Sequence, residues 1–278
     1  MLDRTLYQPR SNEDGSYETL TIDRRGPVDW VTLNRPDQLN AMSRTMMLEL
    51  QHYFGDLYTD QDVRVVVLKG AGRAFCAGLD LKQERDPNEA GPVNGLRVQR
   101  RVSEIVMRMR RAPQPIISLV HGAASGGGFA LALASDIRIA GPKARMNAAF
   151  IRIGLTACDV GVSYFLPRLV GSSLASELML TGDFIDADRA LRTGLVSDVV
   201  EDEELDARAQ RMIDMMLANS PVGVRLTKEC LNMSVDAGSL EAAIAMEDRQ
   251  QILCAQTSDM REGISAFLEK RSPDYSDD

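Results

Sequence analysis

The chain has 278 residues, of which 44% are hydrophobic and 26% charged, and its formal net charge is −8. This length fits one large domain, or a compact domain with an appendage. The composition excludes disorder and collagen, and the negative charge argues against a protein that coats nucleic acid. We therefore expect an acidic globular protein without a nucleic-acid partner.

The cysteines and the apolar stretches place further bounds on the chain. The four cysteines are scattered and form neither a CxxC motif nor a cluster with histidine, so we expect no metal site and reduced thiols in the cytoplasm. The polar N-terminus carries both signs of charge and does not resemble a signal peptide. The most apolar stretch, 116–134, contains His121, two serines and four glycines. We therefore expect no membrane span.

The N-terminal elements begin with strands. Residues 1–17 lack apolar periodicity and are predicted to form a flexible leader, with the core domain covering 18–200. The runs at 19–24 and 28–33 alternate or are β-branched, which predicts two paired strands. Ser43 is a good N-cap, and the apolar residues that follow it recur at helical spacing.

Strands and helices then alternate up to about residue 200. The runs at 63–68 and 115–120 are largely apolar and β-branched, which is typical of strands buried on both faces, and a helix is predicted between them at 93–111. A further strand is expected at 136–140. This alternation favours a parallel α/β core. Residues 201–278 show only helical periodicity and predict a helical region that packs on the core or on a neighbouring subunit.

Two glycine-rich loops follow buried strands, at 70–82 and 121–132. Glycine there lets a ligand approach the backbone, and the second loop opens a helix whose free N–H groups attract negative charge. Neither loop has the spacing of a dinucleotide or P-loop motif. Both could be merely tight turns. Two such loops that each aim one N–H at the same oxygen would form an oxyanion hole.

At these loops the sequence resembles the crotonase (enoyl-CoA hydratase/isomerase) superfamily. The resemblance covers nearly the whole chain and rests on five ordered blocks: LNRPDQLNAMS at 33–43, GRAFCAGLDL at 72–81, HGAASGGGFALALASDIRIA at 121–140, PRLVG at 167–171 and TGDFIDADRALRTGLVSDVV at 181–200. It implies an α/β fold built as a spiral of ββα units with an all-helical C-terminal trimerisation region. It also implies a homotrimer or a dimer of trimers.

The resemblance further implies a coenzyme A thioester as substrate, with no separate cofactor. Its carbonyl oxygen would lie between the backbone amides of Ala77 and Gly127. Other residues are implied to contact the substrate, and Phe267 and Lys270 would close over the coenzyme A tail of a neighbouring subunit. The implied contacts along the two loops are Ala77, Gly78, Leu79, Asp80, Gly126, Ala130 and Phe150.

The sequence departs from a hydratase at two positions. Hydration of an enoyl thioester suits two converging carboxylates, and family members that hydrate carry them where this chain has Ala130 and Phe150. One carboxylate remains in the region, Asp159, which resembles the aspartate of dienoyl-CoA isomerases and of dehalogenating or hydrolytic members. It could act as the acid/base, or it could cap a helix that starts near Val160.

The residues therefore favour isomerisation, hydrolysis or C–C cleavage of an acyl-CoA with Asp159 as the reacting group. One alternative is a true enoyl-CoA hydratase of fatty-acid degradation with an unrecognised acid/base, and another is a non-catalytic acyl-CoA-binding homologue. Other polar residues have structural interpretations: His121, Asp80 and Asp136 would hold loops or helix ends, and Cys158 would be a small core thiol. The arginines of the 93–111 helix would form a solvated face or bind coenzyme A phosphates.

Overall fold

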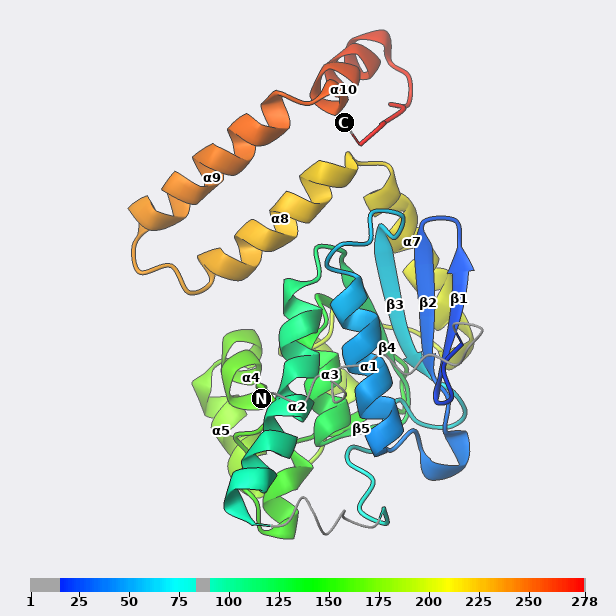
Figure 1. Cartoon of the computed structure of the whole chain (residues 1–278), viewed down its shortest axis with the longest axis vertical. Coiled ribbons are helices and arrows are strands. Elements are labelled where there is room, and N and C mark those ends of the chain that lie inside the picture. Colours follow the sequence, from blue (N-terminus) through cyan, green and yellow to red (C-terminus); the bar gives the residue numbers. More distant parts are fainter. Residues whose placement is uncertain (1–15, 84–90, 278) are drawn as a thin grey trace, which may run out of the picture.

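A six-stranded sheet forms the centre of the computed structural model, which describes residues 16–83 and 91–277 (Figure 1). The strand order is β1-β2-β3-β4-β6-β9, and every neighbouring pair is parallel except β1 and β2. The strands are β1 (Leu20–Arg25), β2 (Val28–Leu33), β3 (Val65–Gly70), β4 (Ile116–Val120), β6 (Ile137–Ala140) and β9 (Asp198–Val199). The predicted strand pair at the N-terminus is confirmed to within one residue.

The chain also forms a smaller sheet, which it enters after β4 and again after β6. It consists of β5 (Ala123–Ser125), β7 (Arg145–Asn147) and β8 (Ile185–Asp186), in that order. Two isolated bridges, Cys76 to Ala124 and Met42 to Leu79, extend its edge toward the first glycine loop. This alternation between two sheets is the predicted spiral of ββα units, and it brings both glycine loops to the edge of the small sheet.

Helices with local start signals cover the core. Ser43 caps the first of them, because its hydroxyl accepts a hydrogen bond from Met46 N. The helices up to residue 192 are α1 (Arg44–Asp56), α2 (Pro92–Arg111), α3 (Gly127–Ala134), α4 (Val162–Val170), α5 (Ser172–Thr181) and α6 (Ala187–Arg192). All eight residues of α3 are buried, so this helix runs through the middle of the molecule.

The large sheet is buried on both faces, as the apolar run at 63–68 predicts. Val66 and Leu68 of β3 belong to the main core with α1 and α2, whereas Val65 and Val67 face a second cluster that includes Ile213 of α7 (Leu205–Leu217). Alternate side chains of a strand point to opposite faces. A strand covered on both sides therefore needs apolar residues at successive positions, which β3 has from Val65 to Leu68, the four residues of the strand that are fully buried.

The remaining helices extend away from the sheets (Figure 1). They are α8 (Pro221–Ser234), α9 (Leu240–Ala255) and α10 (Ser258–Glu269), and Ser220 and Ser239 cap the first two. Lys228 connects α8 to the core, because its ammonium group lies 2.7 Å from both the Asp136 carboxylate and the Gln114 carbonyl. In α9 no residue is buried. Among the described helices, none is long and apolar enough to cross a membrane.

Candidate active site

A buried asparagine shapes the first glycine loop. Asn40 is fully buried, and its Nδ2 donates to the carbonyl oxygens of Ala71 and Ala74, each at 2.8 Å, and of Phe75 at 3.2 Å. Its Oδ1 accepts from Arg35 N at 2.9 Å. The LNRPDQLN segment therefore acts as a brace that holds the 70–78 loop in one conformation, since buried carbonyl groups require partners.

Glycine is required at two positions of the second loop. Gly126 has φ 52° and ψ −117°, a conformation that other residues rarely adopt. An ideal Cβ on Gly128 would lie 2.1 Å from the Cys76 carbonyl oxygen, so no side chain fits between the two loops. The triplet thus lets α3 begin in direct contact with the first loop.

The structure corrects the predicted donor on the first loop. Ala77, expected to point its N–H at the substrate, instead donates it to the Leu39 carbonyl oxygen at 2.9 Å. Met42 binds the loop on both sides of Leu79. Its N–H donates to Gly78 O at 2.7 Å, and its carbonyl accepts from Asp80 N at 3.1 Å. In a parallel bridge of this kind, the residue between the two bonded loop residues, Gly78 and Asp80, points its own N–H away from the bridging strand. That residue is Leu79.

The amides of Leu79 and Gly127 are the pair left available. Within the described part of the chain, neither N–H has an acceptor, and Gly127 is the first residue of α3, where no intrahelical partner exists. The two loops are close, because an ideal Cβ on Gly78 would lie 2.6 Å from Ser125 O and 3.5 Å from Gly127 N. Two free N–H groups at adjacent loops, one of them at a helix N-terminus, can bind a developing negative charge.

The two positions without carboxylates form apolar surroundings. Phe150 belongs to a 3₁₀ helix at Ala149–Ile153, and its ring lies 3.4 Å from the place where a Cβ of Gly126 would be. Ala130 is buried on α3, three residues after Gly127. Neither side chain can transfer a proton.

Asp159 is half-buried and held through one oxygen. Its Oδ1 accepts from Gln99 Nε2 at 2.5 Å and from Val160 N at 2.8 Å, whereas its Oδ2 has no partner among the described residues. Burial raises the pKa of Asp159, and the two hydrogen bonds to Val160 and Gln99 partly oppose this rise. The carboxylate thus has one free oxygen and a pKa above the ordinary aspartate value.

The helix-cap alternative for Asp159 is not what the structure contains. Helix α4 begins at Val162, its N-cap is Gly161, and no side chain caps it. Instead, Asp159 precedes a strained turn, because Val160 has φ 38° and Gly161 has φ 85°. A β-branched residue at positive φ is a genuine outlier, and such strain is concentrated at functional sites.

Other predicted roles have mixed outcomes. His121 accepts or donates a hydrogen bond with the Gly72 carbonyl at 3.0 Å, and Asp80 pairs with Arg35 at 2.9 Å, so both hold the first loop as expected. Asp136 accepts from Ile116 N at 2.8 Å and also binds Lys228. Cys158 is exposed, so its interpretation as a core thiol is wrong, because Ala157 and Val160 take the buried positions on either side of it.

Helix α2, which carries the arginines, packs against α1 and α3, whereas Phe267 and Lys270 lie at the C-terminal helix. On α2, Arg97 and Arg100 are exposed, whereas Arg108 donates to the Gln51 carbonyl at 2.6 Å. Phe267 is 83% exposed on α10, and Lys270 ends that helix. Helix α10 lies far from α3 within one chain (Figure 1). A role of these two residues at a neighbouring subunit stays a prediction.

Sequence reasoning missed two groups. Gln99 carries no motif, and only the packing of α2 beside the Asp159 turn reveals it. Leu79 was included as a lining residue, but the direction of its N–H depends on the bridge to Met42. Among the described residues, no three His, Cys, Asp or Glu side chains come together in a way that could hold a metal ion.

Comparison with known proteins identifies the family of the chain. The family model described as enoyl-CoA hydratase/isomerase matches residues 23–278, and the chain belongs to that family. A probable enoyl-CoA hydratase, EchA12, of Mycobacterium bovis is 40% identical over 259 residues, which cover 91% of each chain. The 1,2-epoxyphenylacetyl-CoA isomerase of Escherichia coli is 37% identical, over 88% of this chain and 93% of that one.

The solved structures show the same fold. A probable enoyl-CoA hydratase/isomerase from Mycobacterium abscessus superposes with a TM-score of 0.87 and is 39% identical, covering 94% of this chain and 99% of that one. The chain is therefore an acyl-CoA enzyme of the crotonase fold.

Proposed function

We propose that this enzyme isomerises an unsaturated acyl-CoA, with Asp159 as the acid/base. The observation that carries the proposal is the pattern of carboxylates: Ala130 and Phe150 stand where hydration would need them, whereas Asp159 is half-buried, precedes the strained Val160, and has no Oδ2 partner among the described residues. The Escherichia coli relative is named as an isomerase of an epoxide acyl-CoA, which supports isomerisation as the class of reaction.

The reaction would begin with the thioester oxygen between the amides of Leu79 and Gly127. Asp159 removes a proton next to the thioester carbonyl, and the electron pair moves onto the thioester oxygen as an enolate. The two N–H groups and the positive end of the α3 dipole stabilise this charge. Asp159 then returns the same proton to another carbon, and the double bond shifts. No atom of the substrate is gained or lost over the two proton transfers.

The raised pKa of Asp159 suits this role. A general base works best when its pKa approaches the working pH, and burial moves an aspartate in that direction. The amide pair requires no protonation change of its own, because backbone N–H groups keep their dipoles at every pH.

Hydration is the second candidate, because several relatives carry hydratase names, among them a short-chain-enoyl-CoA hydratase of Clostridium acetobutylicum at 34% identity. Hydrolysis or C–C cleavage would also use a single carboxylate, and a non-catalytic homologue would use none. The products of a panel of enoyl-, dienoyl- and β-keto acyl-CoAs, measured by mass and by double-bond position, separate these cases. Unchanged mass with a shifted double bond supports isomerisation, whereas gain of water or release of free coenzyme A contradicts it.

We also propose that the enzyme assembles as a homotrimer or a dimer of trimers through α8, α9 and α10. These helices expose apolar side chains such as Ile252, Phe267 and Leu268, which a second copy could bury. Light scattering of the purified chain tests this, and a monomer at micromolar concentration would contradict it.

A further inference from the structure

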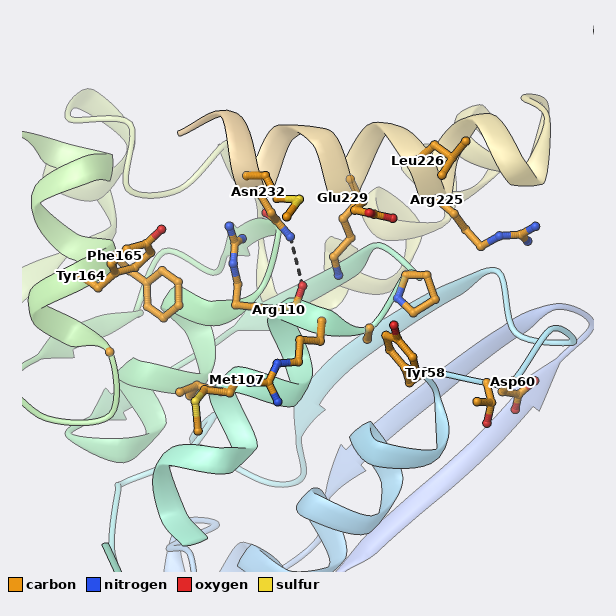
Figure 2. A pocket seen from close by; sticks show the side chains of 18 of the residues that line it. Tyr58, Asp60, Met107, Arg110, Tyr164, Phe165, Arg225, Leu226, Glu229 and Asn232 are labelled. Atoms are coloured by element: carbon orange, nitrogen blue, oxygen red, sulfur yellow. Dashed lines mark hydrogen bonds between the residues drawn. The ribbon is translucent and has the colours of Figure 1, made fainter. Parts of the chain in front are cut away.

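A cavity of about 980 Å³ lies between α8 and the core (Figure 2). Its floor is the C-terminal half of α2, its roof is α8, and Tyr164 and Phe165 of α4 close one side. Asp236, just after α8, accepts hydrogen bonds from Tyr164 Oη and, at 2.8 Å, from Arg168. These two bonds hold α8 against α4. The cavity is therefore a feature of the folded chain itself.

The cavity starts next to the proposed reacting group. Ser103, which lines it, lies one helical turn after Gln99, the partner of Asp159. Gly161, another lining residue, comes two residues after Asp159. From Ser103 the lining continues along α2 to Arg111, a span of roughly 12 Å at the rise of an α-helix. A substrate held at Asp159 could thus extend its far end into this space.

The walls favour an uncharged, apolar occupant. Apolar side chains contribute from all three helices, including Val106, Met107, Phe165 and Leu226. Each cationic group lies near a carboxylate, and Arg110 and Lys228 share one: Arg110 lies 3.7 Å and Lys228 2.7 Å from Asp136, Arg111 3.4 Å from Glu104, and Arg225 2.6 Å from Asp277. Asp60 and Glu229 add negative charge to the lining. An anion would have to compete with these pairs.

We propose that this cavity receives the distal part of a large apolar acyl group, so that the preferred substrates are long-chain or bulky acyl-CoAs. The inference rests on the proposed function, because it places the thioester end at Leu79, Gly127 and Asp159. The volume is at the upper end of the roughly 300–1,000 Å³ that pockets for drug-sized ligands occupy. A short acyl group would leave the cavity empty.

Binding of saturated acyl-CoAs tests the proposal without any turnover. Calorimetric titration with butyryl-, octanoyl-, dodecanoyl- and palmitoyl-CoA should show affinity that rises with length, by up to about fourfold for each buried methylene. Equal affinity for all lengths overturns the proposal. Length-dependent binding without isomerisation of the matching enoyl-CoAs contradicts the proposed function and leaves the cavity assignment intact.

Two variants fill the cavity from opposite sides. Met107→Trp on α2 and Leu226→Trp on α8 should each reduce the ratio of palmitoyl to butyryl affinity by at least tenfold. Met215→Trp is the matched control, because Met215 is 60% exposed on α7 outside the cavity and the ratio should stay as in the wild type. An unchanged ratio in both cavity variants overturns the proposal. Light scattering adds a further outcome: a changed assembly with an unchanged ratio assigns the cavity to contacts between copies.

Discussion

Gln99 donates a hydrogen bond from its Nε2 to Oδ1 of Asp159 at 2.5 Å, across 60 residues of sequence. Because the Val160 amide binds the same oxygen, Oδ2 is left without a partner among the described residues. Gln99 thus orients the carboxylate from outside the turn that carries it. We regard Gln99 as a positioning residue, and Asp159 as the group that reacts.

Asp159→Asn should abolish turnover and leave acyl-CoA binding intact. The amide keeps the shape and the hydrogen bond to Val160 but cannot accept a proton, and loss of a general base typically costs about 10²- to 10⁴-fold in rate. Turnover by mass spectrometry and the dissociation constant of a saturated acyl-CoA are the two measurements. Unchanged turnover would remove Asp159 from the mechanism.

Gln99→Met should move the acidic limb of the kcat/KM profile to higher pH. A donor to the ionised carboxylate lowers its pKa, so removing it lets burial raise the pKa of Asp159 further, and the base is protonated at a higher pH. Gln99→Glu, which keeps the length but adds a like charge, should move the limb the same way. A uniform loss of rate at all pH values would indicate a merely structural role. Thermal unfolding serves as the control, because Gln99 is exposed.

The amides of Leu79 and Gly127 should respond to the substrate carbonyl, and the amide of Ala77 should not. In a chain labelled with ¹⁵N at leucine, glycine and alanine, a saturated acyl-CoA should shift the first two amide protons downfield. Ala77 N–H is already bound to Leu39 O and has no capacity for a new acceptor. A thioether analogue without the carbonyl oxygen provides the control. A shift at Ala77 with none at Leu79 would show that the substrate carbonyl binds the Ala77 amide predicted from the sequence, and not that of Leu79.

Hydration of crotonyl-CoA should be weak or absent. The four-carbon substrate meets an oxyanion site flanked by Ala130 and Phe150, and neither can activate water or protonate carbon. The loss of absorbance of the conjugated thioester is the measurement. Robust formation of the 3-hydroxy product would show that the acid and base lie elsewhere.

Lys228→Met should destabilise the chain by about 1 to 3 kcal/mol, because it removes a charge-assisted hydrogen bond and leaves Asp136 with Arg110 alone, 3.7 Å away. Chemical denaturation measures this cost. The double variant with Asp136→Asn should recover part of it, since no carboxylate then lacks its Lys228 partner, and only the partly exposed Arg110 loses an ion pair. If the losses in the free energy of unfolding of the two single variants add up in the double variant, the pair does not couple α8 to the core.

Much of the secondary structure could be predicted because its causes are local. Ser43, Ser220 and Ser239 each cap a helix through their own side chains, and the apolar run of β3 matches a strand covered on both faces. The sequence also predicted the family from its ordered blocks. It showed that Ala130 and Phe150 replace two carboxylates, since residue identity alone decides whether a side chain can transfer a proton.

By itself, then, the sequence determined the α/β spiral, the glycine loops and Asp159 as the one candidate carboxylate. The tertiary structure alone decided which amides are free: Ala77 is occupied because Leu39, 38 residues earlier, supplies an acceptor, and Leu79 is turned outward by Met42. It also decided that Gln99 reaches Asp159 and that α8 encloses a cavity behind them. Hydrogen bonds and cavities between distant segments depend on packing, and no local pattern of residues records them.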